Sequence, residues 1–129
     1  MTADWQQGGD VNPAQPRGVD LTIREVDGVR VLDVRGVVDL LSAPAFREHV
    51  DAALAEAPRA LLIDLTEVDF FASAGLEVLV SARRSAPPTT QVAVVADGPA
   101  TSRPIRITGV DQIVALYPTL QQAVDGIGH

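Results

Sequence analysis

Ser73 stands where an added phosphate would be stabilised. It follows an apolar strand expected at residues 61–65, a short acidic connection and a pair of phenylalanines, and an apolar helix begins just after it. Free backbone N–H groups and the positive end of the dipole at a helix N-terminus favour negative charge. A phosphate on the Ser73 hydroxyl would therefore be in a favourable place. The alternative is that Ser73 only caps the helix, since serine is a favoured N-cap residue.

The composition excludes several kinds of site and partner. The 129 residues include no cysteine, and His49 and His129 are the two histidines, which excludes disulfides, thiolate metal sites and histidine clusters. A net charge of −7 argues against nucleic acid and anionic membranes as partners. No apolar run approaches the roughly 18–20 residues of a membrane-spanning helix, and no signal-peptide pattern opens the chain. We expect a soluble, cytoplasmic protein of one domain.

The chain divides into a tail and a folded domain. Residues 1–18 have few large apolar side chains to offset the entropy of ordering, so we expect a disordered tail there and a domain at 19–127. Strands are expected at 21–26, 29–34, 61–65, 92–96 and 113–116, and helices between Ser42 and Pro58, at 74–85, around Ile105 and at 120–127. The alternation predicts a single α/β domain, a mixed β-sheet with helices packed against it and parallel later strands.

Three motifs in order carry a resemblance to a known family. Residues 70–76, Phe-Phe-Ala-Ser-Ala-Gly-Leu, resemble the Phe-x-x-Ser-x-Gly-Leu signature of the STAS domain. Residues 36–39, Gly-Val-Val-Asp, resemble its Gly-x-x-Asp pattern, and residues 109–123 resemble its C-terminal sequence. The resemblance covers residues 19–127 and is strongest to bacterial anti-sigma factor antagonists of the sporulation and general-stress type.

The resemblance implies a partner-switching regulator rather than an enzyme, with no cofactor and no metal. Such an antagonist, when unphosphorylated, binds an anti-sigma factor that is also a serine kinase, and so releases a sigma factor. Phosphorylation of the serine that corresponds to Ser73 ends the complex, and a phosphatase restores it. The alternative is a STAS module that senses a nucleotide or another small ligand, or that serves as a scaffold.

The resemblance also indicates which residues contact the partner: Asp39, Phe71, Ala72, Ser73, Ala74, Gly75 and Leu76. Ala72 departs from the family, in which aspartate often precedes the serine, so a local charge that could help engage the kinase is missing.

Three of these residues have alternative roles. Asp39 either shapes the loop before the Ser42 cap or helps to define the recognised surface. Gly75 either packs closely against a neighbouring loop or lets a partner's backbone approach. Phe70 is expected in the core, and Phe71 is expected to be partly exposed beside the serine, where it could anchor an interface.

Overall fold

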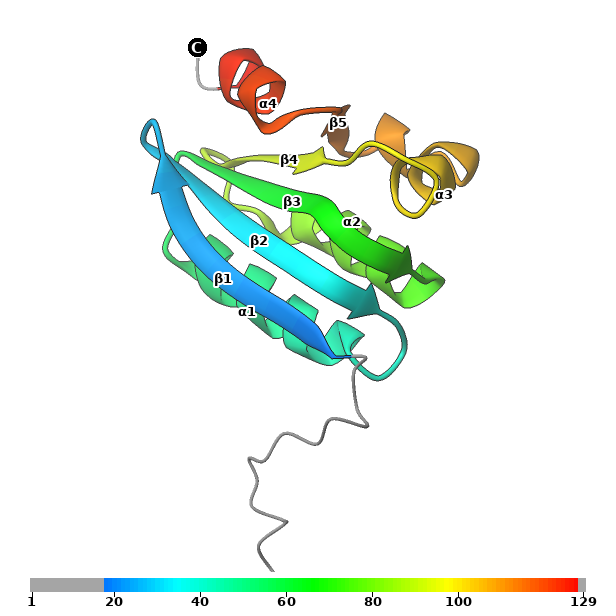
Figure 1. The fold of residues 1–129 in the computed structure, drawn as a ribbon. Coiled ribbons are helices and arrows are strands. Elements are labelled where there is room, and N and C mark those ends of the chain that lie inside the picture. Colours follow the sequence, from blue (N-terminus) through cyan, green and yellow to red (C-terminus); the bar gives the residue numbers. More distant parts are fainter. Residues whose placement is uncertain (1–17, 128–129) are drawn as a thin grey trace, which may run out of the picture.

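The sheet that carries the site has five strands in the order β1-β2-β3-β4-β5 (Figure 1). The computed structural model describes residues 18–127. β1 pairs antiparallel with β2, whereas the three later pairings are parallel, so the predicted mixed sheet is confirmed. The strands are β1 (Val19–Val26), β2 (Val29–Val38), β3 (Ala60–Phe71), β4 (Gln91–Val95) and β5 (Ala115–Tyr117).

Helices cover the two faces of the sheet unequally. α1 and α2 lie against one face, and α4 packs against the other face near one end (Figure 1). The helices are α1 (Ala43–Ala55), α2 (Ser73–Ser85), α3 (Ser102–Ile107), the 3-10 turn η2 (Val110–Gln112) and α4 (Leu120–Gly126). All the predicted helices are present, so the layered α/β architecture is confirmed.

The core consists of two clusters divided by the sheet. Side chains alternate along β3, so Leu61 and Leu65 pack with Phe46 on the side of α1 and α2. Leu62 lies on the other side, in the smaller cluster that includes Ala123 of α4. A strand covered on both faces needs apolar side chains at successive positions, which explains the apolar run of the sequence.

The β1–β2 hairpin turns at Asp27 and Gly28, as the sequence predicts. Both residues have positive φ, 52° and 79°, as a two-residue type I′ turn requires. The two strands then pair from Val26 and Val29 at the turn to the start of β1 without a shift of register.

β3 is longer than the sequence predicts. Glu67 and Asp69, expected in a connection after the apolar run, lie inside the strand, which ends at Phe71. β2 also continues, to Val38, and the two strands stay paired through two register shifts. Because pairing satisfies the backbone groups of both strands, β3 persists beyond the point where the apolar pattern ends.

Ser42 occupies the N-cap position of α1, but its hydroxyl does not cap the helix. The hydroxyl donates to the carbonyl oxygen of Val37 at 2.7 Å and accepts from the N–H of Asp39 at 2.9 Å. The expected capping role is therefore wrong, because the β2–α1 connection folds back tightly enough to take this hydroxyl for itself.

Two expectations concern the rest of the chain. The predicted tail lies, apart from Gly18, outside the described residues, as do residues 128 and 129. Among the described helices, none combines the length and the apolar character that crossing a membrane requires.

Candidate functional site

Ser73 is the first residue of α2, and its side chain is exposed. Ala72 occupies the N-cap position in an extended conformation, so the helix-capping alternative for Ser73 is wrong. Within residues 18–127 the Ser73 hydroxyl makes no hydrogen bond, and the N–H groups of Ser73 and Ala74 have no acceptor. The hydroxyl is thus accessible and lies beside two unused backbone donors.

The end of β2 is fastened to the loop before α2. The N–H of Ala72 donates to the carbonyl oxygen of Val38 at 2.8 Å. The next residue, Asp39, accepts hydrogen bonds on its carboxylate from the N–H groups of Leu41 at 3.0 Å and Ser42 at 2.9 Å. The bond from the Ser42 backbone is the main cause that holds the pKa of Asp39 below its ordinary value. Asp39 therefore does shape its loop, as the first of its two alternatives requires.

Three large apolar side chains are exposed at this end of the sheet. The exposed fractions are 78% for Leu40, 88% for Leu41 and 53% for Phe70. Leu40 also lines a shallow hollow of about 250 Å³ together with Ala74, the neighbour of Ser73. We call Leu40, Leu41, Phe70 and Ser73 the Ser73 surface. Large apolar side chains exposed at one end of a sheet are a feature of protein–protein contacts.

Phe70 and Phe71 have the opposite roles to those predicted. Phe71 is only 5% exposed, and its ring meets that of Phe46 edge-on, with 6.2 Å between the ring centroids and 68° between the planes. Both phenylalanines belong to β3, and successive residues of a strand point to opposite faces. The expectation of an exposed Phe71 is therefore wrong, and Phe70 is the aromatic side chain available to a partner.

Gly75 is buried, and its space is filled from within the protein. A Cβ atom built on Gly75 would lie 2.8 Å from the ring of Phe71 and 2.8 Å from Cγ1 of Val38. Close packing is thus the reason for glycine here, although its neighbours are core side chains rather than a loop. The missing Cβ leaves no room for the backbone of a partner.

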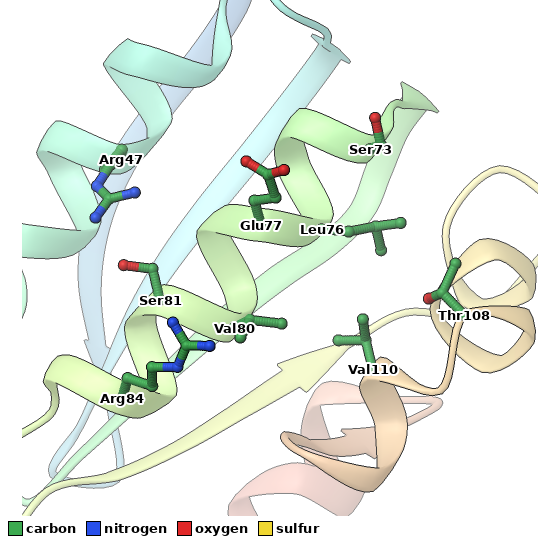
Figure 2. Close-up of a pocket in the computed structure, with 9 residues that line it drawn as sticks. All are labelled: Arg47, Ser73, Leu76, Glu77, Val80, Ser81, Arg84, Thr108 and Val110. Carbon is green, nitrogen blue, oxygen red and sulfur yellow. The ribbon is translucent and has the colours of Figure 1, made fainter.

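A groove of about 530 Å³ runs along α2 from Ser73 toward Arg84 (Figure 2). Leu76 and Val80 point from α2 toward Val110, which lies across the groove (Figure 2). Leu76, one of the residues expected to bind the partner, therefore reaches the surface only through this groove. The remaining lining residues are Arg47, Glu77, Ser81 and Thr108.

The sequence did not single out Leu40 and Leu41. The signal was present, because two leucines between Asp39 and Ser42 fit neither the preceding strand nor the helix that follows. Apolar residues outside both periodicities have no core position to fill.

Comparison with known proteins identifies the family. The model of the STAS domain matches residues 20–123. The chain belongs to the STAS domain family. It is 36% identical over 112 residues to the anti-sigma-F factor antagonist RsfB of Mycobacterium tuberculosis, covering 87% of this chain and 92% of the relative.

Solved structures show the same fold. A crystal structure of an anti-sigma factor antagonist from Mycobacterium paratuberculosis is 40% identical, with a TM-score of 0.82, over 84% of this chain and 93% of that chain. The antagonist SpoIIAA in its unphosphorylated form, 16% identical, has a TM-score of 0.66 over 85% of this chain and 100% of its own. At that identity the second likeness concerns the fold alone.

Proposed function

We propose that this protein is an anti-sigma factor antagonist that phosphorylation of Ser73 switches off. The unphosphorylated protein binds an anti-sigma factor with serine kinase activity in the cytoplasm and so frees a sigma factor. The kinase phosphorylates Ser73, the complex ends, and a phosphatase restores binding. The names of the two mycobacterial relatives support the class of partner. The observation that carries the switch is the exposed Ser73 hydroxyl, which has no partner among the described residues.

The switch has a simple physical basis. A phosphate adds about −1.5 to −2 charges at neutral pH. Ser73 is followed by Ala74, which lines a hollow together with the exposed Leu40, and burying an unpaired charge in an apolar interface there is costly. Glu77 follows Ser73 by four residues, on the same side of α2, and its carboxylate repels the phosphate. The phosphate thus opposes docking while leaving the fold unchanged.

The protein is, on this proposal, the substrate of an enzyme and not itself an enzyme. Its role requires a surface that fits the kinase and one hydroxyl within reach of ATP. Neither needs a cofactor, a metal or direct contact with nucleic acid.

Phosphorylation with a candidate anti-sigma kinase and ATP tests the proposal. Intact-mass spectrometry should show one added phosphate, and peptide mapping should place it on Ser73. Ser73→Ala should keep its affinity for the anti-sigma factor and resist the kinase. Ser73→Glu should bind poorly, although one carboxylate imitates a phosphate imperfectly.

Ser81→Ala is the matched control, because Ser81 lies on the same helix and lines the same groove but is half-buried. It should be phosphorylated and bind like the wild type. A phosphate mapped to another residue, or full binding by the protein phosphorylated on Ser73, would contradict the switch.

The groove along α2 favours one alternative, a sensor of a small ligand. Its mixed lining, with the guanidinium groups of Arg47 and Arg84 and the apolar Leu76 and Val80, suits an anionic ligand with an apolar part. Calorimetry of the isolated protein with ATP and GTP distinguishes the two functions. Saturable nucleotide binding without the kinase supports the sensor. A heat of binding seen only in the presence of the anti-sigma factor supports the antagonist.

A further inference from the structure

β1 is an open edge of the sheet. It pairs with β2 on one side, and its other side has no strand partner within residues 18–127 (Figure 1). Its eight residues contain no proline and run without a bulge. Natural edge strands usually carry a proline or a bulge, because a regular edge can pair with a second strand. Ile23 on this edge is a large apolar residue that is 43% exposed.

The hairpin determines which backbone groups face outward. A two-residue turn closes on a hydrogen-bonded pair, here Val26 and Val29, and such pairs alternate along an antiparallel ladder. The N–H and C=O groups of Thr22 and Arg24 therefore point toward β2. Those of Leu21 and Ile23 point away from the sheet, where a second strand could bond to them.

Two copies of β1 are complementary when they pair antiparallel about a twofold axis at Thr22. Asp20 of each copy then lies opposite Arg24 of the other copy, and Leu21 lies opposite Ile23. Opposite charges and paired apolar side chains both stabilise neighbouring strands. An axis at Ile23 instead would leave Arg24 opposite Thr22 and bring the carboxylate of Glu25 against Leu21.

The side chains are already arranged for this register. Leu21 packs against the core on the side of α1, and Ile23 lies on the same side of the strand. On the other side Arg24 bonds to the carboxylate of Asp33 on β2, at 2.5 Å from Nε. Because a guanidinium group has five N–H donors, Arg24 can also bind Asp20 of a second copy.

We infer that two copies of this chain associate through β1, antiparallel about Thr22, so that their sheets form one continuous sheet. The contact involves one short strand of each copy, so the dimer is weak and forms with increasing concentration. The Ser73 surface lies at the ends of β2 and β3, beyond the start of β1, and the twofold axis puts the two copies of that surface at opposite ends of the dimer. Each dimer therefore offers two sites to a kinase.

Disulfide cross-linking of the full chain tests the register directly. The chain has no cysteine, so Thr22→Cys introduces a single thiol. At the axis, in a non-hydrogen-bonded pair, the two Cα atoms lie about 4.5 Å apart, within the range that a disulfide spans. Glu25→Cys is the matched control, because Glu25 is exposed on the same strand but its two copies lie about 20 Å apart. Under mild oxidation Thr22→Cys should cross-link at least about tenfold faster.

The ion pairs are tested by sedimentation velocity over a range of concentrations. Asp20→Arg places arginine opposite Arg24 and should remove the dimer, whereas Asp97→Arg, an equal change of charge at another exposed site, should keep it. Equal cross-linking of the two cysteine variants, or a wild type that stays monomeric up to about 1 mM, would overturn the inference. Because neither experiment uses a kinase, both outcomes are independent of the Ser73 switch.

Discussion

Asp39 and Ser42 hold each other in place through reciprocal hydrogen bonds. The carboxylate of Asp39 accepts from the backbone N–H of Ser42 at 2.9 Å, and the Ser42 hydroxyl accepts from the backbone N–H of Asp39 at 2.9 Å. The pair closes the loop that presents Leu40 and Leu41. The aspartate of the Gly-x-x-Asp motif thus supports the exposed leucines, whatever contact it makes with a partner.

The first prediction concerns Asp39 and pH. Its pKa is lowered in the folded protein, chiefly by the bond from the Ser42 backbone, so its charge stabilises the fold above the unfolded pKa of about 3.9. This contribution is lost as the pH falls through the lower, folded value. Asp39→Asn should unfold at lower urea than the wild type at pH 7, and the difference should shrink below about pH 4.

Asp97→Asn is the control for this experiment. Asp97 is exposed and has no hydrogen bond or ion pair with the described part of the chain. Its replacement should therefore leave the urea midpoint unchanged at pH 7 and at pH 3. A difference between Asp39→Asn and the wild type that is constant from pH 7 to pH 3 would show that the carboxylate charge is not involved.

The second prediction concerns Gly75. Gly75→Ala forces a methyl group against the Phe71 ring and Val38, and overpacking of a core costs about 1–3 kcal/mol. The gain from replacing glycine by alanine in a helix is at most about 1 kcal/mol, so chemical denaturation should show a net loss of stability. Gly18→Ala, which meets nothing within 4 Å, should be neutral. An unchanged or raised stability of Gly75→Ala would mean that the core can yield at this point.

The sequence predicts the order of the elements well, because apolar periodicity and turn residues are local signals. The type I′ turn at Asp27 and Gly28 and the start of α2 are examples. It fails where a distant partner decides. β3 continues through Glu67 only because β2 continues beside it, and the choice between Phe70 and Phe71 follows from that extension.

In the candidate site, too, the sequence predicts what depends on local signals and misses what depends on distant contacts. Its serine is found from its place between a strand and a helix, which is a local property. The exposure of Leu40 and Leu41 depends on how the hydroxyl of Ser42 closes their loop, and no propensity encodes that contact.

The third prediction compares the two phenylalanines. Phe71→Ala removes a buried ring and should lower the unfolding free energy by about 3–5 kcal/mol. Phe71→Leu keeps part of the buried side chain and should lower it by less. Phe70→Ala should change stability by less than about 0.5 kcal/mol, since this ring is half exposed. In a titration with the anti-sigma factor Phe70→Ala should weaken binding by about tenfold, or about 1.4 kcal/mol. If Phe70→Ala bound normally, the contact would lie elsewhere on the Ser73 surface.

The last prediction concerns Ala72, where the family often has aspartate. Ala72 is the N-cap of α2 and has no side chain with which to cap it. Both aspartate and asparagine are good N-cap residues, and either should accept a hydrogen bond from an N–H group in the first turn. Ala72→Asp and Ala72→Asn should therefore each raise the unfolding free energy by about 1 kcal/mol.

The two variants separate the cap from the charge in the reaction with the kinase. If the missing carboxylate weakens engagement of the kinase, Ala72→Asp should be phosphorylated on Ser73 faster than the wild type, whereas Ala72→Asn should react at the wild-type rate. Equal acceleration of both would assign the effect to the cap, because only the cap is common to them. If neither reacts faster, although both unfold at higher denaturant concentration, the partner of this chain does not use the carboxylate and is matched to alanine at this position.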